Sequence, residues 1–386
     1  MTKRLLIVFH DDSSLFMARS LADDLSKWAA KIDFLFIEAN AGEAPKLSES
    51  QLSESLAGLQ IAYRRTQYRA FDEQILKKYD AVISAKFPVS FRKRAIERSW
   101  RFKSRPCFIS VFPGIEFFPE RGFEIRGMFD IIALNSVSDR ELYEHSPPSV
   151  APAHQQQIVC NPYFVERNLP PTSETKKDIV FFTQSVTPAS REGRAETLKV
   201  LARIAKENPS YRVIIKLRHL EDENKNHTHI EQHSYQSIAN ELRISSLFQF
   251  RTGSTKMCLE NCAFALTCSS TAGIQAISQD IPTAFLTGFD GWQKDNIAIR
   301  AQKKFSTSGL LVDVSEAHLL NFATGNTSWR KQNLASIDCG DQLLKAIERF
   351  HNNPPRDTGI MATLRGLRQT IKDTYRSFRN KLPHKI

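Results

Sequence analysis

A hydroxyl-rich turn in the second half of the chain has the residue types to hold a phosphate group. Ser269, Ser270 and Thr271 follow the apolar run 263–268, and residues 272–278 are predicted to begin a helix. A Ser or Thr at a helix N-terminus accepts hydrogen bonds from backbone N–H groups that have no partner within the helix. The same N-terminus carries partial positive charge, which favours phosphate binding. An ordinary capped helix is the alternative.

A basic segment after another predicted strand has the charge to neutralise the same phosphate. The predicted strand 211–217 leads into a segment that contains Lys216, Arg218, His219 and Glu221. Open α/β sheets bind their ligands at the carboxyl ends of their strands. Lys, Arg and His together suit a phosphodiester and the nucleotide that leaves with it. A solvated charged loop is the alternative.

Three polar residues follow the predicted strand 178–182. Thr183, Gln184 and Ser185 either donate hydrogen bonds to a bound ligand or cap the helix predicted to start near Ser190. Both readings remain open at this point.

Acidic residues in the first half are candidates for proton transfer. Asp11 and Asp12 follow the apolar run 3–9, and Glu116 lies in a Pro-Gly-Ile-Glu turn. A reaction in which a hydroxyl group attacks needs a carboxylate or a His to take the hydroxyl proton. Capping of the first helix by Asp12 or Ser13 is the alternative.

Alternating strands and helices must position these residues. Short apolar runs predict strands at 3–9, 32–37, 81–84, 107–112, 129–135, 158–162, 178–182, 211–217, 247–250, 263–268 and 283–286. Helices are predicted at 15–30, 60–78, 91–100, 192–207 and 234–242, and a polar loop at 38–55. This alternation is typical of parallel sheets covered by helices.

A Pro-rich polar segment at 169–177 is the predicted linker between two halves. We therefore expect an α/β fold with two Rossmann-like domains facing a cleft. The acceptor-side domain is predicted at 1–168, the donor domain at 178–345, and a basic helical tail at 346–386.

Length and composition set limits on the class of protein. A chain of 386 residues exceeds the usual size of a single core, and its 41% hydrophobic and 25% charged residues are ordinary for a globular protein. The net charge of +11, with a pI near 9.3, favours an anionic partner such as nucleic acid, a lipid headgroup, a sugar nucleotide or a glycan. The six cysteines lack the spacing of zinc ligands and are expected to be buried thiols of a cytosolic protein.

The ends of the chain carry no predicted membrane span. The N-terminal apolar run is interpreted as the first core strand because it is too short for a signal peptide. Near the C-terminus, apolar residues recur at steps of three and four, at Leu364, Leu367, Ile371, Tyr375 and Phe378. Such an amphipathic helix either packs against the body of the protein or binds an anionic membrane surface.

The segment 269–286, SSTAGIQAI followed by DIPTAFL, resembles the donor site of GT-B glycosyltransferases, particularly bacterial capsule and lipopolysaccharide enzymes. The sialyltransferases and Kdo transferases, which use CMP-sugars, share this pattern together with an upstream basic His motif. The resemblance implies that the hydroxyl residues hold the donor phosphate and that His219 contacts the phosphate of CMP. The chain departs from the pattern where Leu220 replaces a Pro and where Gln275 replaces a Glu that binds the donor ribose.

Weaker similarity covers the first half. The Pro-Gly-Ile-Glu turn, the spacing of Arg126 and Asp130 and the turn that begins at Ser136 are similar to those of predicted bacterial glycosyltransferases. The resemblance is stronger at 178–312.

The resemblance implies a glycosyltransferase that moves an acidic sugar, sialic acid or Kdo, from a CMP-activated donor to a bacterial surface glycan. Its partners are then a nucleotide sugar and a glycan or glycolipid acceptor. No metal or separate cofactor is expected, because GT-B enzymes usually stabilise the leaving phosphate with protein donors and helix dipoles. The expected location is the cytoplasm, at the inner face of the cytoplasmic membrane if the tail binds lipid.

Two alternatives remain. A UDP- or GDP-sugar transferase of the same fold has the same motifs. A nucleic-acid-binding protein is suggested by charge alone, but no RNA- or DNA-binding motif is recognised in the sequence, so no nucleic-acid partner is expected.

Overall fold

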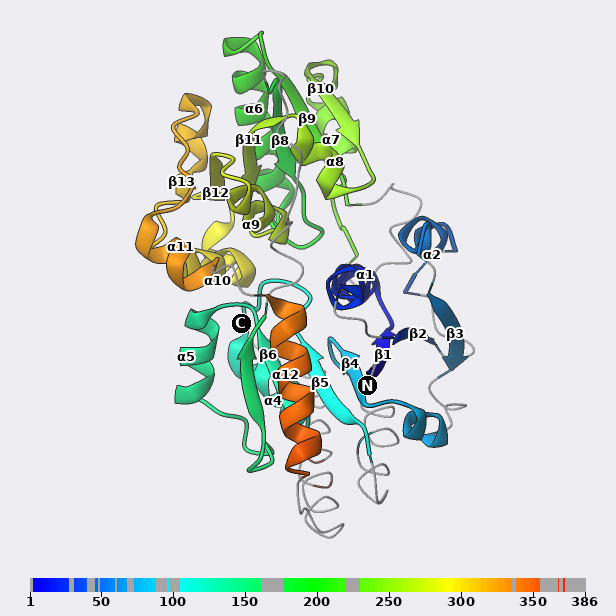
Figure 1. Cartoon of the computed structure of the whole chain (residues 1–386). Coiled ribbons are helices and arrows are strands. Elements are labelled where there is room, and N and C mark those ends of the chain that lie inside the picture. Colours follow the sequence, from blue (N-terminus) through cyan, green and yellow to red (C-terminus); the bar gives the residue numbers. More distant parts are fainter. Residues whose placement is uncertain are drawn as a thin grey trace. The chain divides into compact units, whose positions relative to one another are not determined.

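The chain consists of two compact units, each built on one parallel sheet (Figure 1). The computed structural model describes residues 3–27, 31–39, 46–47, 49–59, 61–67, 73–87, 96, 105–160, 176–218, 230–334, 338–354, 367 and 371. One unit comprises Met1–Tyr163 and Ile337–Ile386, and the other Phe164–Ser336. The predicted α/β class with two Rossmann-like units is confirmed.

The first unit has a seven-stranded sheet in the order β3-β2-β1-β4-β5-β6-β7. Its strands are β1 (Arg4–Phe9), β2 (Lys31–Glu38), β3 (Ala62–Gln67), β4 (Ala81–Ser84), β5 (Cys107–Val111), β6 (Ile131–Leu134) and β7 (Gln156–Val159). Its described helices are α1 (Asp12–Ser26), α2 (Glu49–Leu56), the 3-10 helix η1 (Glu73–Lys78), α4 (Pro119–Arg126), α5 (Val137–His145) and α12 (Cys339–Asn352). The strand order reverses at the junction of β1 and β4.

The second unit has a six-stranded sheet in the order β10-β9-β8-β11-β12-β13. Its strands are β8 (Asp178–Phe182), β9 (Arg212–Lys216), β10 (Phe248–Arg251), β11 (Cys262–Thr267), β12 (Thr283–Thr287) and β13 (Leu311–Asp313). Its described helices are α6 (Arg191–Glu207), α7 (Tyr235–Glu241), α8 (Thr255–Glu260), α9 (Thr271–Ser278), α10 (Asn296–Phe305) and α11 (Thr327–Asn333), with 3-10 helices η4 (Ser245–Leu247), η5 (Trp292–Lys294) and η6 (Val314–Leu319). Here the strand order reverses between β8 and β11.

The central strands are apolar because both of their faces are buried. Along β1, Leu5, Ile7 and Phe9 belong to one hydrophobic cluster, and Leu6 and Val8 belong to another. Side chains alternate between the two faces of a strand, so a parallel strand covered by helices on both faces reads as an unbroken apolar run. This is why the central strands are predictable from sequence.

Helix α12 corrects the predicted C-terminal domain boundary. Leu343, Ala346, Ile347 and Phe350 are buried in the core cluster of the first unit. The chain therefore returns to the first unit near residue 337, and the boundary predicted at 345 is wrong. The error arose because the amphipathic pattern of a helix shows that it has a buried face but not which core it covers.

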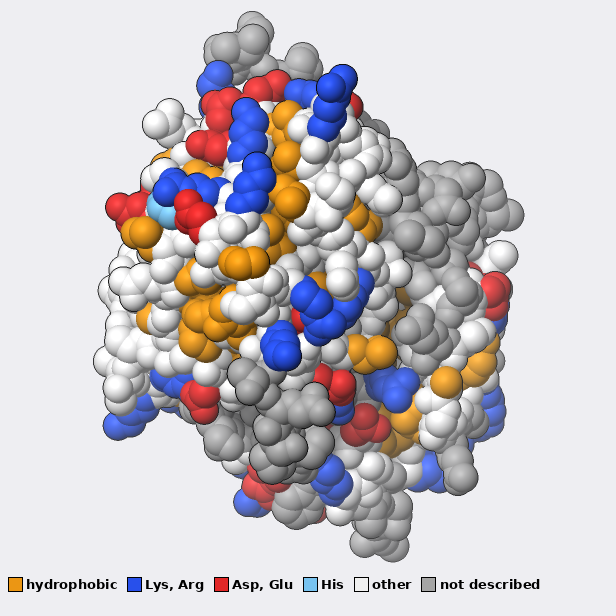
Figure 2. Space-filling view, turned by 90° about the horizontal axis from the view of Figure 1, so that it is seen from above, with side chains coloured by type: hydrophobic (Ala, Val, Ile, Leu, Met, Phe, Trp, Pro, Cys, Tyr) orange, Lys and Arg blue, Asp and Glu red, His pale blue; other side chains and the backbone are white. Residues whose placement is uncertain are grey.

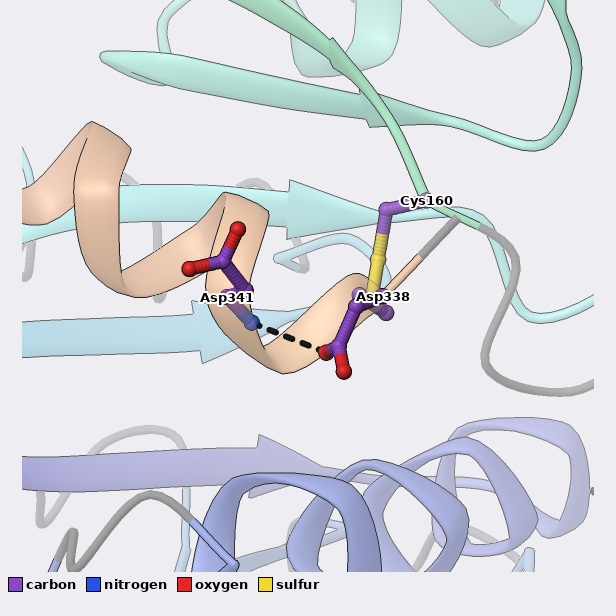
Figure 3. Close-up of a disulfide and its surroundings, with 4 residues drawn as sticks. Cys160, Asp338 and Asp341 are labelled. Atoms are coloured by element: carbon purple, nitrogen blue, oxygen red, sulfur yellow. Dashed lines mark hydrogen bonds between the residues drawn. A yellow bond between two sulfur atoms is a disulfide. The ribbon is translucent and has the colours of Figure 1, made fainter. Parts of the chain in front are cut away.

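A disulfide lies at the start of this returning helix. Cys160, directly after β7, is bonded to Cys339 (Figure 3). Asp338 caps the helix by accepting a hydrogen bond from the Asp341 N–H at 3.0 Å. The expectation that all cysteines are free thiols is therefore wrong for this pair, whereas Cys107, Cys258, Cys262 and Cys268 are free and buried.

Two further expectations in the first unit are corrected. Residues 60–78 are not one helix but contain β3 and η1, and part of the predicted 38–55 loop forms α2. Strand β3 lies at the sheet edge, paired with β2, and most of its described side chains are exposed. An edge strand whose two faces are both exposed to solvent lacks the apolar run that identifies a central strand.

Some predictions fall outside the described residues. They are the helix at 91–100, apart from Ile96, which is buried, the linker up to residue 175, and the tail beyond 354, apart from Leu367 and Ile371, which are exposed. No helix in the described ranges is long and apolar enough to cross a membrane.

Candidate functional site

The reversal of strand order in the second sheet brings the predicted donor-site residues together. Thr183 and Gln184 directly follow β8, and Ser269 and Ser270 follow the neighbouring strand β11. Doubly wound sheets bind ligands outside the carboxyl ends of their strands at such a switch point. The fold therefore places two segments that are far apart in sequence at one potential binding site.

Side-chain hydrogen bonds connect the ends of these strands. The Ser269 hydroxyl donates to the Gln184 side-chain oxygen at 2.5 Å, across the switch point. The backbone N–H and the hydroxyl of Thr183 both donate to the Lys216 carbonyl at 3.1 Å, which ties the end of β8 to the end of β9. The predicted residues thus form a connected set rather than isolated surface groups.

Ser270 is the N-cap of α9. Its hydroxyl accepts a hydrogen bond from the Ala272 N–H at 3.2 Å, and its own N–H donates to the Thr267 hydroxyl at 3.1 Å. The capping alternative is therefore realised. A helix start presents several N–H groups and a positive partial charge, so a cap on one N–H leaves the site suited to an anion.

Close packing fixes α9 against the sheet. A Cβ atom on Gly273 would lie 2.6 Å from the Phe285 ring and 3.0 Å from the Thr267 methyl group. Only glycine allows the helix to approach the strands so closely. Gln275, predicted to contact the donor ribose, is buried on the same helix.

The predicted basic segment is described only in part. Lys216 is the last residue of β9, is buried, and donates from Nζ to the Leu217 carbonyl at 2.7 Å. Arg218 is partly buried. His219 and Glu221 lie outside the described residues, so their predicted roles stay predictions.

Arg194, on α6, was missed by the sequence analysis. It is almost completely buried, and its guanidinium contacts the loop that follows β8. A signal was present in the sequence, since Arg194 shares a helix face with Leu198 and Leu201, which lie in the core. A charged residue on an apolar helix face requires buried partners.

The first unit has a polar cluster at its own switch point, after β1 and β4. Asp11 caps α1, with one carboxylate oxygen accepting from the Ser14 N–H at 2.9 Å and hydroxyl at 2.6 Å. Its other oxygen lies 3.3 Å from His10 Nε2 and 4.0 Å from Lys86 Nζ. Capping was expected from Asp12 or Ser13 and is instead made by Asp11.

Burial and the neighbouring charges in this cluster shift the pKa values of His10 and Asp11. Burial lowers the pKa of the His10 imidazole to about 4, despite the opposing effect of Asp11. Burial would raise the pKa of Asp11, but His10, Lys86 and the hydrogen bonds from Ser14 outweigh it and lower the pKa to about 2. At neutral pH the cluster therefore holds a neutral imidazole beside a carboxylate.

Glu116 is partly exposed at the same edge of the sheet. One of its oxygens accepts from the Phe118 N–H at 2.9 Å, and the other lies 3.7 Å from Arg126. Arg126 is buried and donates to the Ala85 carbonyl at 2.8 Å.

Asp130 takes no part in this cluster. It precedes β6, at the opposite end of the strands, forms an ion pair with Arg105 at 2.7 Å and lies 2.8 Å from His154 Nε2. The sequence spacing of Arg126 and Asp130 therefore does not reflect a contact between them. Asp12, the remaining acidic candidate, accepts from the Ser13 N–H at 2.8 Å.

Within the described ranges, no group of three or more His, Cys, Asp or Glu side chains is arranged to hold a metal ion.

Comparisons with solved structures show similarity of fold at low sequence identity. A co-structure of S. aureus MnaA with UDP has a TM-score of 0.57 and 13% identity, and the match covers 92% of this chain and 100% of that one. The Methanocaldococcus jannaschii UDP-GlcNAc 2-epimerase in complex with UDP-GlcNAc and UDP has a TM-score of 0.53 and 11% identity, and the match covers 90% of this chain and 99% of that one. Anabaena HepE in complex with UDP has a TM-score of 0.50 and 11% identity, and the match covers 98% of this chain and 100% of that one.

At these identities the similarity concerns the fold, which is of the GT-B type. Among curated proteins, none matches this chain. The model of one protein family, described as "Putative glycosyltransferase (DUF6716)", matches residues 5–350. Because this match spans most of the 386 residues, the chain belongs to that family of glycosyltransferase-like enzymes.

Proposed function

We propose that this protein transfers a sugar from a UDP-activated donor to a glycan or glycolipid acceptor. The observation that carries the proposal is the Ser269–Gln184 hydrogen bond, which joins the loops after β8 and β11 beside the start of α9. UDP is preferred over the CMP of the sequence-based expectation because the S. aureus, M. jannaschii and Anabaena proteins of similar fold were solved with UDP.

In this proposal the second unit stabilises the leaving nucleotide. As the acceptor oxygen bonds to the anomeric carbon, the bond between that carbon and the donor phosphate oxygen breaks, and negative charge develops on the phosphate oxygen. The start of α9 supplies N–H donors and a positive partial charge to this oxygen. Ser270 caps this helix start, and Thr271, Arg218 and His219 are the further residues predicted to contact the donor phosphate.

The acceptor hydroxyl loses its proton in the first unit. Asp11 is a poor base at neutral pH because its pKa is lowered to about 2 and Ser14 occupies one of its oxygens. His10 is neutral at pH 7, but burial lowers its pKa to about 4, so its imidazole is also a weak base, although Asp11 would stabilise an imidazolium. We therefore assign Glu116, the more exposed carboxylate, as the base, with His10 as its rival.

The proposed acceptor and the proposed membrane location rest on the charge of the chain and on its C-terminal tail. An anionic surface glycan or lipid-linked glycan complements the net charge of +11. Leu367 and Ile371, the described residues of the predicted tail helix, expose their apolar side chains. Binding of this tail to an anionic membrane would place the enzyme at the cytoplasmic face, near lipid-linked acceptors.

A nucleic-acid-binding protein is the alternative from another class. On the face shown in Figure 2, the described Lys and Arg side chains lie in several separate groups, with acidic and hydrophobic side chains between them. Nucleic-acid-binding domains typically gather their basic residues on one face or along one helix. A gel shift that persists at near-physiological salt would favour this alternative.

The first experiment is a thermal-shift panel with UDP, CMP, GDP and ADP. A ligand that binds only the folded state raises the melting temperature, and at one hundred times its Kd it adds about 2.7 kcal/mol of stability. We expect UDP to stabilise the protein most. A larger shift with CMP would restore the CMP-sugar donor, and no shift with any nucleotide would overturn the proposed function.

Product analysis then identifies the reaction. Because a UDP-GlcNAc 2-epimerase is among the proteins of similar fold, UDP-GlcNAc is incubated without acceptor and the sugar nucleotide is analysed for a C2 epimer. Transfer instead requires an acceptor and releases UDP. Parallel reactions with EDTA and with added Mg²⁺ test whether the transfer needs a metal ion.

A further inference from the structure

Arg194 holds the loop after β8, which belongs to the proposed donor site, against a second segment of the same unit. It lies in the first turn of α6, which begins after the N-cap residue Ser190. The side chain is 1% exposed, so its charge is almost completely removed from water. A buried guanidinium is costly unless its donors are paired.

The five N–H donors of the guanidinium all have described acceptors. Nε donates to the Pro188 carbonyl at 2.9 Å, and Nη2 donates to the carbonyls of Ser185 at 2.7 Å and Gln184 at 3.2 Å. Nη1 donates to the Glu231 carboxylate and the His233 carbonyl. The planar fork of arginine thus joins the loop after β8 to the segment 231–233.

The second of these segments lies just before α7. Glu231 and His233 are C-terminal to the predicted basic segment, whose described residues are Lys216 and Arg218. The guanidinium also lies 4.8 Å from the ring of Tyr235, the first residue of α7. Arg194 therefore connects the loop after β8 with the segment that precedes α7.

The orientation of the first loop follows from these bonds. In a trans peptide the C=O and the N–H point in opposite directions. Because the carbonyls of Gln184 and Ser185 point at Arg194, the N–H groups of Ser185 and Val186 point away from it. Successive N–H groups held in this way suit a phosphate.

A buried hydroxyl in the same loop lacks a partner. The Ser185 hydroxyl makes no hydrogen bond within the described structure, although the residue is only 4% exposed. An unpaired buried hydroxyl is unfavourable in the ligand-free protein, and a ligand oxygen would satisfy it. Its neighbour Gln184 makes the hydrogen bond to Ser269 that spans the switch point.

We propose that Ser185 contacts a phosphate of the nucleotide-sugar donor and that Arg194 is the positioning residue that fixes the loop after β8 against the segment 231–233. This inference rests on the proposed nucleotide-sugar function, gives Ser185 a specific role and adds Arg194. Arg194 acts only through the loops and does not touch the donor.

The test compares Ser185→Ala and Arg194→Lys with the unaltered full-length protein. Arg203→Lys is the matched control, because Arg203 is an exposed arginine of the same helix that pairs with Glu207. Three quantities are measured: the Kd of UDP by calorimetry, the melting temperature, and hydrogen–deuterium exchange of residues 183–190 and 231–234 without ligand.

Ser185→Ala should weaken UDP binding about three- to ten-fold, as expected for one hydrogen bond, without lowering the melting temperature. Arg194→Lys should weaken UDP binding about ten-fold or more and speed up hydrogen–deuterium exchange in both segments, because lysine cannot form the five hydrogen bonds of the planar guanidinium. Arg203→Lys should change none of the three quantities. A structural role alone would lower the melting temperature of Arg194→Lys without weakening UDP binding.

Glu231→Gln provides a second variant if Arg194→Lys does not fold. It retains Arg194 and removes the charge of one partner, so exchange should rise mainly in 231–234 and UDP binding should weaken. Unchanged UDP affinity in Ser185→Ala would overturn the role of Ser185. Unchanged loop exchange in Arg194→Lys or Glu231→Gln would overturn the role of Arg194.

The outcomes separate this inference from the proposed function. If the unaltered protein binds none of the nucleotides, the proposed function and the role of Ser185 both fail. Faster exchange in Arg194→Lys would then still establish that Arg194 holds the two loops together.

Discussion

The Ser269 hydroxyl donates a hydrogen bond to the Gln184 side chain at 2.5 Å, although the two residues are 85 positions apart in sequence. They follow β11 and β8, the neighbouring strands at which the order of the second sheet reverses. A single hydrogen bond therefore spans the switch point where this class of fold binds its ligands.

A double-mutant cycle on this pair should show coupling. Ser269→Ala leaves the Gln184 amide without its partner and should lower the free energy of unfolding by about 1–3 kcal/mol. Gln184→Ala should lower the free energy of unfolding less in the Ser269→Ala protein than in the unaltered protein, because its hydrogen-bond partner is already absent there. Urea unfolding of the four proteins measures the difference. Strictly additive costs would show that the hydrogen bond contributes nothing to stability.

Replacement of His219 should weaken donor binding without unfolding the protein. His219→Ala removes a charge-assisted contact to the donor phosphate, worth roughly 1.5–3 kcal/mol, and Ser270→Ala removes a neutral one worth about 0.5–1.5 kcal/mol. Because His219 and Ser270 would contact the same phosphate, the loss of donor-binding free energy in the double variant should differ from the sum of the two single losses.

Donor affinity and turnover are measured for both single variants and for the double. His318→Ala is the control, since the His318 ring contacts the Ser315 carbonyl on η6. Normal affinity and turnover in a folded His219→Ala protein would remove His219 from the site.

The stability of the protein should fall between pH 6.5 and pH 4, and His10→Gln should reduce that fall. The pKa of His10 is lowered from 6.5 to about 4 in the folded protein. As the pH drops through this window, the unfolded chain takes up the proton first, so the free energy of unfolding decreases. The stability that depends on neutral His10 is thus complete above pH 6.5 and lost towards pH 4.

The other charged groups around His10 are Asp11, Asp12, Lys46 and Lys86. Asp11 adds a separate loss at lower pH, from 3.8 down to about 2, because its pKa is also lowered in the folded protein. Urea unfolding at a series of pH values, with His318→Gln as control, measures both windows. An unchanged slope between pH 6.5 and 4 in His10→Gln would exclude a neutral buried imidazole.

Removal of α12 should prevent folding of the first unit. Leu343, Ile347 and Phe350 are buried in its core. Burial of each is worth roughly 1.5–3 kcal/mol, whereas a folded domain is stable by only about 5–15 kcal/mol. A chain that ends before Asp338 should therefore be insoluble, or should lose the part of its circular dichroism signal and thermal transition that belongs to the first unit. A cooperative thermal transition of normal size in that chain would refute the assignment of α12 to this core.

A chain that ends after Pro354 should fold but bind anionic membranes less well. This truncation keeps α12 and removes the amphipathic tail, including the exposed Leu367 and Ile371. Sedimentation with vesicles of anionic phospholipid should decrease relative to the full chain, and vesicles of neutral lipid are the control. Loss of folding in this chain would mean that the tail packs against the body.

Local sequence patterns determined the elements of the core and the residue types of the site. The apolar run of β1 predicts a strand buried on both faces, and the Ser269–Thr271 turn predicts a capped helix start with donors for a phosphate. These predictions succeed because strand burial and helix capping depend on residues close together in the chain.

Only the tertiary structure decided which distant segments meet. It assigned α12 to the first unit, placed β3 at a sheet edge, joined Cys160 to Cys339, and brought His10 and Asp11 close to Lys86. The role of Arg194 depends on carbonyl groups from two loops that meet only after the sheet has formed. The sequence shows that Arg194 interrupts an apolar helix face, but strand order and loop geometry determine which groups satisfy its charge.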